Sequence, residues 1–252
     1  MADRLRLLGL RLLVLAAVLG LWVLLVRTGA IDPFFFPRPL DIVTRIFKWF
    51  ISGEIYQHLW VTLIEVLLAY VIGTILGVVS GLWLGLSPTA ARILEPYIKA
   101  FNSIPRVILA PIFILWFGLG MLSKVALGVS LVYFIAFFNV YQGIKEASPV
   151  IIANARVLGA DKRQLLRHVY LPSATTWILS SLRVSIGFAV IGAVVGEYLG
   201  ATAGVGYLIA HAEGLFDTVG VFAGMLVLGI FVTVLDLAVS IAERRLLKWR
   251  PA

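Results

Sequence analysis

Six long apolar runs constrain this chain more than any other feature of its 252-residue sequence. A lipid hydrocarbon core about 30 Å thick needs roughly 20 apolar residues per helix, and each run is close to that length. A membrane β-barrel would instead show alternating segments of about ten residues. The sequence therefore predicts an all-α membrane protein with about six spans, near residues 7–26, 60–84, 104–120, 124–141, 176–199 and 219–241.

Charged residues make up only 13% of the chain, yet its formal net charge is +8. Such an excess could mark a nucleic-acid-binding surface, but in a membrane chain surplus Lys and Arg are typical of cytoplasmic loops. With a cytoplasmic N-terminus, the outer segments hold only Arg27, Arg38, Arg45, Lys48 and Lys124. The inner segments hold Arg4, Arg6, Arg11, Arg92, Lys99, Arg106, Lys145, Arg156, Lys162, Arg163, Arg167, Arg244, Arg245, Lys248 and Arg250. This asymmetry predicts cytoplasmic N- and C-termini, contact with lipid and no nucleic-acid partner.

The first apolar run admits two interpretations. It begins with basic residues, "RLRLLGLRLLVLAAVLGLWVLLV", as a secretory signal peptide does. However, the run is long and the following "VRTGAID" is a poor match to a cleavage site. We therefore expect a retained helix, and a single transmembrane domain over residues 1–252 in which the span at 7–26 is peripheral to a core at 60–241.

Two predicted spans carry stripes of small residues. Residues four apart share one face of a helix, and small residues let membrane helices approach closely. The second span has Gly73, Gly77, Gly81 and Gly85, and the fifth has Ser181, Ser185, Gly192 and Gly196. We expect these stripes to serve helix packing, with a pore lining as the alternative.

Prolines and charges inside spans are candidates for the lining of a pathway. Pro105 suits the first turn of the third span, whereas Pro111 removes a backbone donor and should kink the helix. A kinked helix can line a cavity, because water or neighbouring protein must satisfy the freed carbonyl. Charge inside a membrane is costly and marks functional candidates, which here are Glu65, Arg183, Glu197 and Asp236.

The chain lacks the sequence motifs of P-loop ATPases, H-E-x-x-H metalloproteases and G-x-S-x-G hydrolases. It lacks cysteine and any Gly-Lys dipeptide, which excludes thiolate nucleophiles, cysteine metal sites and a P-loop for ATP. His58, His168 and His211 lie far apart, and neither H-E-x-x-H nor G-x-S-x-G occurs. No obvious pair of intramembrane carboxylates suggests acid–base catalysis. We expect a non-catalytic chain that binds no metal or cofactor itself.

Four basic residues gather in the segment "ARVLGADKRQLLRHVYLP", residues 155–172. Ser148, followed by a proline, suits the start of one short helix, and Gly159 suits its end. Asp161 and Gln164 have capping-box spacing for a second helix, which Pro172 should stop. This pattern predicts a rigid cytoplasmic knob at residues 146–172, with an amphipathic helix pair lying on anionic lipid as the alternative.

The spacing in this segment resembles a signature of permease subunits of binding-protein-dependent ABC importers. That signature is E-A-A, three residues, Gly, nine residues, Ile, one residue and Leu-Pro. Here nine residues follow Gly159 before V-Y-L-P, which ends in Leu171 and Pro172, and residues 153–155 occupy the E-A-A positions. Ala153 stands where the family has Glu, a departure that removes the carboxylate but keeps the helix–turn–helix pattern.

Three further blocks look like permeases of the nitrate, sulfonate, taurine and thiamine-precursor import group: "FFFPRPLDI", "LGLSPTAARILEPYIKAFNSIPRVILAPIFILWFGLG" and "GAVVGEYLGATAGVGYLI". The resemblance implies a type I ABC importer permease fold in a bacterial inner membrane, with a coupling helix between the fourth and fifth spans. It also implies two ATPase subunits that bind ATP and Mg, a second and usually identical permease copy, and an external solute-binding protein. The implied cargo is a small anionic solute.

From this resemblance we expect the ATPase to be coupled through Ala153, Ala155, Arg156, Gly159, Ala160, Arg163, Leu171 and Pro172. Candidate pathway residues are Pro111, Asn139, Arg183 and Glu197. The alternative function is an ion-coupled secondary transporter or channel, in which Glu65, Arg183 or Glu197 would carry the coupling charge. A membrane scaffold or enzyme is disfavoured by the missing catalytic groups.

Overall fold

The computed structural model describes residues 2–246, and the side chains of residues 6–241. Within that part of the chain, helices and turns account for the secondary structure and there is no strand. The helices long and apolar enough to cross a membrane are α1 (Ala2–Arg27), α3 (Glu54–Leu86), α6 (Met121–Lys145), α9 (Leu171–Gly200) and α11 (Thr218–Leu246). The prediction of an all-α membrane protein is confirmed.

The span expected third, at 104–120, is a broken one. It consists of α4 (Pro88–Asn102), the short 3-10 helix η1 (Arg106–Leu109) and α5 (Ala110–Phe117), and the two halves are bent by 84°. The prediction of one helix over 104–120, kinked at Pro111, is therefore wrong. The bend lies just before Pro105, and Pro111 falls in the first turn of α5, where a missing backbone N–H leaves no helical hydrogen bond unmade.

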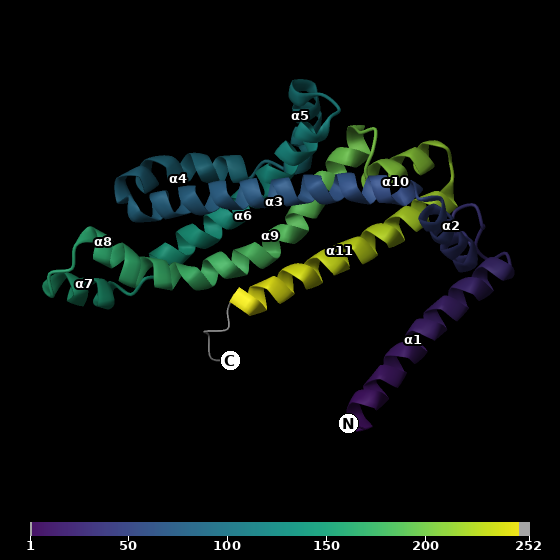
Figure 1. The fold of residues 1–252 in the computed structure, drawn as a ribbon, viewed down its shortest axis with the longest axis horizontal. Coiled ribbons are helices and arrows are strands. Elements are labelled where there is room, and N and C mark those ends of the chain that lie inside the picture. The colour runs from purple at the N-terminus through teal and green to yellow at the C-terminus, as the bar shows by residue number, and fades with distance from the viewer. Residues whose placement is uncertain (1, 247–252) are drawn as a thin grey trace.

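Short helices close the two ends of the bundle (Figure 1). At one end lie α2 (Pro39–Ser52) and α10 (Val205–Gly214), and at the other lie α7 (Pro149–Val157) and α8 (Lys162–Leu165). The sequence did not predict α2 and α10, because neither is long enough to give the signal of a membrane span.

The core forms where α6 packs between α3 and α9. The glycine stripe of α3 lies against α6: a Cβ added to Gly77 would stand 2.5 Å from the Tyr133 carbonyl oxygen and 2.7 Å from the Ala136 Cβ. On the other side of α6, Gly192 of α9 lies directly against the backbone of Gly128. Small residues therefore allow both helix pairs to approach at backbone distance.

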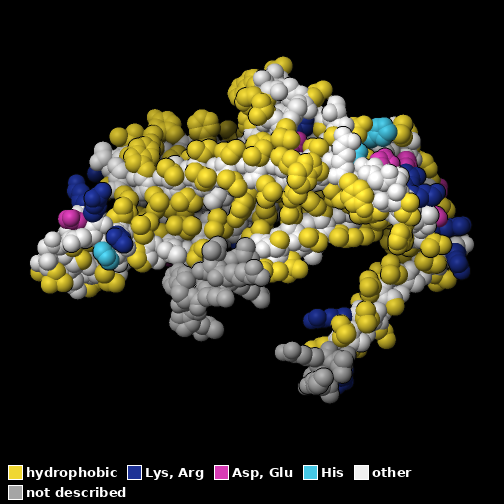
Figure 2. Space-filling view, in the orientation of Figure 1, with side chains coloured by type: hydrophobic (Ala, Val, Ile, Leu, Met, Phe, Trp, Pro, Cys, Tyr) yellow, Lys and Arg dark blue, Asp and Glu magenta, His cyan; other side chains and the backbone are white. Residues whose placement is uncertain are grey.

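Helix α1 stands apart from this core. It joins the bundle near its C-terminal end, where the Trp22 ring lies 6.0 Å from the ring of Phe222, and it diverges from the bundle toward its N-terminal end (Figure 1). Leu13, halfway along α1, is 66% exposed. Figure 2 shows hydrophobic side chains covering the middle of the molecule, with Lys and Arg gathered at the ends beside α7 and α2.

The basic residues at the extreme ends of the chain, which contributed to the expected orientation, are beyond what the structure describes. The side chains of Arg4, Arg244 and Arg245, and the whole of Lys248 and Arg250, lie outside the described residues.

Candidate functional site

A two-helix hairpin, α7 with α8, connects α6 to α9 at one end of the bundle, and we call it the knob (residues 146–172). The Ser148 side chain accepts a hydrogen bond from the Ile151 backbone N–H at 3.5 Å, at the start of α7. Gly159 follows the end of α7 with a φ of 83°, in the left-handed region. The Ala160 N–H then bonds back to the Ala155 carbonyl at 2.9 Å, which closes α7 with a Schellman turn.

A capping box holds the start of α8. The Asp161 carboxylate accepts from the Gln164 backbone N–H at 2.7 Å, and the Gln164 side-chain oxygen accepts from the Asp161 N–H at 2.8 Å. Both caps predicted from the sequence are thus confirmed. Since each end of the turn is held by defined hydrogen bonds, the knob has a fixed shape.

The expectation that Pro172 stops the second helix is wrong. The helix continues from α8 through a π turn, η2 (Leu166–Tyr170), into α9. The Leu171 N–H bonds to the Leu166 carbonyl five residues back, so the chain is already widened where the proline ring enters. The knob is consequently joined to α9 by an unbroken helical segment.

The knob has its own apolar interior and an apolar tip. Ala147, Leu165 and Val169 are buried, with Ile152, Ala155, Ala160 and Tyr170 packed around them. At the tip, Val157 and Leu158 are 88% and 87% exposed. A rigid hairpin that presents two nearly bare aliphatic side chains has a surface suited to a protein partner.

The residues expected to couple to an ATPase fall into three groups. Ala153, Arg156, Gly159 and Arg163 are exposed on it. Ala155 and Ala160 pack in its interior, while Leu171 and Pro172 begin α9.

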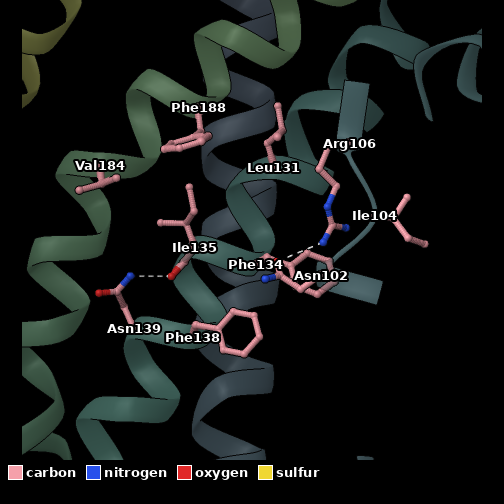
Figure 3. Close-up of a pocket in the computed structure, with 10 residues that line it drawn as sticks. All are labelled: Asn102, Ile104, Arg106, Leu131, Phe134, Ile135, Phe138, Asn139, Val184 and Phe188. Carbon is pink, nitrogen blue, oxygen red and sulfur yellow. Dashed lines mark hydrogen bonds between the residues drawn. The ribbon is translucent and has the colours of Figure 1, made fainter. Parts of the chain in front are cut away.

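A second feature is a cavity of about 520 Å³ beside the middle of α6 (Figure 3). The residues that line it come from α4, η1, α6, α9 and the bend after α4: Asn102, Ile104, Arg106, Leu131, Phe134, Ile135, Phe138, Asn139, Val184 and Phe188. The lining is largely apolar and aromatic, with one cation and two amides, a composition typical of a small-molecule site.

Two polar contacts shape the cavity wall (Figure 3). The Arg106 guanidinium lies 3.9 Å from the centroid of the Phe134 ring and donates to the Asn102 side-chain oxygen at 3.1 Å. Across the cavity, the Asn139 amide donates to the Ile135 carbonyl at 2.8 Å. The sequence analysis counted Arg106 among the basic residues of the inner segments, at the start of the span 104–120, because the bend that turns it toward α6 was not predicted.

A third feature is a buried polar cluster, made of Thr62, Glu65, Lys124 and Glu197, each at most 2% exposed. Glu197 accepts from the Thr62 hydroxyl at 2.6 Å and from the Gly206 backbone N–H at 2.7 Å. The Glu65 carboxyl lies beside that of Glu197, so the fold makes a carboxylate pair that the sequence did not reveal.

The cluster connects three spans to the first turn of α10. Lys124 donates to the carbonyls of Leu119 and Gly120, and its charge faces both carboxylates. Glu197 was a candidate for the pathway, and Lys124 was counted in an outer segment. Both side chains are buried where the helices pack. Their contacts hold the N-terminus of α10 against α3.

The remaining candidates from the sequence are scattered. Asn139 lines the cavity, whereas Pro111 lies exposed in the first turn of α5. Arg183 lines a separate crevice of about 160 Å³ together with Asp236. No group of three or more metal-ligating side chains occurs among the residues that the structure describes.

Comparison with known proteins finds relatives that are all described as membrane components of transport systems. Residues 58–248 match the family model described as "Binding-protein-dependent transport system inner membrane component". A protein named as the aliphatic sulfonates transport permease SsuC of Bacillus subtilis is 33% identical over 95% of this chain and 87% of its own length. The taurine transport permease TauC of Escherichia coli is 31% identical over 93% and 87%.

A further relative and a solved structure extend the comparison. The formylaminopyrimidine transport permease ThiX of Halalkalibacterium halodurans is 35% identical over 87% of each chain. A chain of the MetNI methionine ABC transporter, solved in inward-facing conformations, covers 76% of this chain and 95% of its own, with a TM-score of 0.65 and 19% identity.

Proposed function

The chain belongs to the family of binding-protein-dependent transport inner membrane components, and from that premise we propose that it lines the pathway of an importer of small anions and docks on the ATPase through its knob. It is a non-catalytic, multi-pass permease subunit of an ABC importer, with the type I fold, and ATP hydrolysis is done by a separate ATPase. This membership also decides against a secondary transporter or channel.

The observation that carries the docking proposal is the shape of the knob. Its α7 helix has nine residues and is about 14 Å long at 1.5 Å per residue. Both ends of its turn are capped, and its tip leaves Val157 and Leu158 almost fully exposed. An exposed aliphatic pair gains free energy when a partner covers it, at roughly 25 cal/mol per Å² of apolar surface.

The connections of the knob suit the transmission of force. Its buried interior includes Ala147, just after α6, and Val169, just before α9. Movement of the knob would therefore pull on two core spans at once. In our proposal, closure of the ATPase dimer pushes the knobs of two permease copies together and rocks these spans between inward-open and outward-open states.

The charges of the knob support both its orientation and its mode of docking. By the positive-inside rule, Arg156, Lys162, Arg163 and Arg167 favour a cytoplasmic position for the knob. Since Ala153 replaces the acidic residue of the family signature, docking would depend on the apolar tip and on exposed Arg156 and Arg163. The proposed arrangement has cytoplasmic termini, a second identical permease copy, and a solute-binding protein at the opposite end, near α2 and α10.

The anionic class of solute rests on the names of the relatives, of which two carry sulfonates or taurine. Others carry a formylaminopyrimidine or riboflavin, so relatives of this kind serve more than one class of solute. Testing the partner binding protein against a panel of sulfonates, nitrate and neutral heterocycles would identify the solute.

The docking proposal is tested at Gly159. Nothing lies within 4 Å of a Cβ built there, so a substitution is opposed only by the φ of 83°. A β-branched residue should strain the turn by about 1–2 kcal/mol, whereas Asn tolerates this conformation better.

We expect Gly159→Val to reduce ATPase co-purification and ATP-dependent uptake, and Gly159→Asn to preserve most of both. Normal membrane levels of each variant, measured by immunoblot, would show that a loss of ATPase binding is a docking defect and not a folding defect. Native-like ATPase binding and uptake by a well-expressed Gly159→Val variant would refute the docking role.

A further inference from the structure

Arg106 lies near the middle of the membrane-spanning bundle. Its guanidinium rests on Phe134, the fourteenth residue of the 25-residue helix α6. At 1.5 Å per residue, Phe134 is about 20 Å from the start of α6 and about 17 Å from its end. The bend between α4 and α5 is what brings this side chain to such a depth.

The guanidinium has no carboxylate partner among the described residues. Their ion pairs join Arg45 with Asp217, and Lys99 and Lys145 with Glu95. One donor of Arg106 is given to Asn102 and its face lies against Phe134. A guanidinium has five N–H donors in a fixed fork, so most remain for the cavity.

Lys124 and Arg183, two other cations within the spans, are placed differently. Lys124 is buried and faces both Glu65 and Glu197. Arg183 shares its small crevice with Asp236. Arg106 differs from both because no acidic residue lines its cavity.

We propose that Arg106 is the contact residue for the oxyanion group of the transported solute at mid-membrane, a proposal that rests on the importer function proposed above. An uncompensated charge at this depth is costly, and such charges face cavities and mark the path of a substrate. The planar fork of Arg matches the paired oxygens of a sulfonate, carboxylate or nitrate. The cation–π contact with Phe134 holds the fork in place between transits.

The rest of the cavity suits a solute that binds transiently during transport rather than one that binds tightly. Its volume of about 520 Å³ accommodates a small organic molecule. Phe138, Phe188 and Leu131 give an apolar wall for a carbon chain, and Asn139 supplies an amide on the opposite side. A single cation without a second charged group beside it binds an anion weakly enough to release it, which conduction requires.

The chain has no cysteine, so one introduced thiol can report the charge inside the cavity. We would introduce Ile135→Cys, which lines the cavity, in the complex with its ATPase reconstituted in nanodiscs. Two thiol reagents of similar size serve as probes: methanethiosulfonates bearing an ethylsulfonate or an ethyltrimethylammonium group. The measured quantity is the ratio of the sulfonate and ammonium reaction rates, each divided by the rate of the same reagent with a free thiol in solution.

We expect the sulfonate probe to be favoured, and Arg106→Gln to lower the rate ratio by about tenfold or more, because a unit charge at close range outweighs thermal energy. Arg106→Lys should keep most of the ratio, and Arg183→Gln, which alters the other crevice, should leave it unchanged. Inorganic sulfate should slow labelling of the Arg106 protein by a neutral maleimide more than labelling of the Arg106→Lys variant, which lacks the fork.

A ratio that does not favour the sulfonate probe, or one that Arg106→Gln leaves unchanged, would overturn the assignment of Arg106. Such a result would leave ATP-dependent uptake and ATPase docking intact. Conversely, a chain that does not bind the ATPase would contradict the proposed function. The labelling ratio would still test the role of Arg106 in that case. A fall in both labelling rates without a change in their ratio would show a structural effect and refute the anion contact.

Discussion

The substitution Gly77→Ala should separate α3 from α6. The added methyl group would lie 2.5 Å from the Tyr133 carbonyl oxygen, 2.7 Å from the Ala136 Cβ and 2.9 Å from the Phe137 backbone nitrogen. Non-bonded carbon atoms prefer separations of about 3.5–4.0 Å, so the shortfall is about 1 Å. These neighbours are backbone atoms and a Cβ, which no change of rotamer can move, so the helices themselves must shift.

The size of the effect follows from two opposing contributions. Overpacking a well-packed interface costs about 1–3 kcal/mol, and contact with three rigid atoms places this site near the upper value. Replacing Gly by Ala within a helix returns about 1 kcal/mol through helix propensity. The expected net loss is about 2 kcal/mol, which corresponds to roughly 4–8 °C in the melting temperature of a chain of this length.

Thermal unfolding of the purified permease in detergent would measure this loss. Gly229→Ala in α11 is the matched control, since nothing lies within 4 Å of a Cβ built at Gly229. It should leave the melting temperature unchanged or raise it. If Gly77→Ala had the same melting temperature as the native chain or as the control, the close approach of α3 and α6 would be refuted.

Four further substitutions each test a single side chain. Glu197→Ala should lower the free energy of unfolding by about 3 kcal/mol, because it leaves the buried Thr62 hydroxyl and the charge of a buried lysine without this carboxylate. Asp161→Ala should cost about 1 kcal/mol of local stability and speed amide hydrogen exchange in α8, with a smaller effect in α7 from Ser148→Ala, whose cap bond is 3.5 Å long. Arg163→Glu, on the exposed face of the knob, should reduce ATPase co-purification without changing the melting temperature.

Each of these expectations has an outcome that contradicts it. For Glu197, the contradiction is a variant as stable as the native chain. Equal exchange rates after Asp161→Ala and in the native protein would show that the capping box does not hold α8. Unchanged ATPase capture by Arg163→Glu would remove that residue from the docking surface.

The sequence could predict the elements that depend on local signals. Long apolar runs gave the main spans, and the spacing of Asp161 and Gln164 gave the capping box that the structure shows. It could not predict that a π turn would accommodate Pro172, because the widened turn depends on how α9 packs. Nor could it predict the short helices α2 and α10, which lie at the end of the bundle.

Only part of the candidate site could be predicted from the sequence, because the rest depends on how the spans pack. Glu65, Lys124 and Glu197 come from three different spans, and only the packing of those spans brings them together. Arg106 was counted among the inner basic residues at the start of a span, since the bend after α4 is a tertiary feature. A cation next to Pro105, between two apolar stretches, was the one local sign that could have drawn attention to it.

The central claim, that the knob docks on an ATPase, is tested most directly by cross-linking. Because the chain has no cysteine, Leu158→Cys at the knob tip provides a single thiol, and Leu13→Cys on the outlying helix α1 is the control. A short thiol-to-amine cross-linker applied to the assembled importer should join residue 158, and not residue 13, to the ATPase. Absence of a cross-link from Leu158→Cys in an intact, ATP-hydrolysing complex, with a cross-link from Leu13→Cys, would contradict the account.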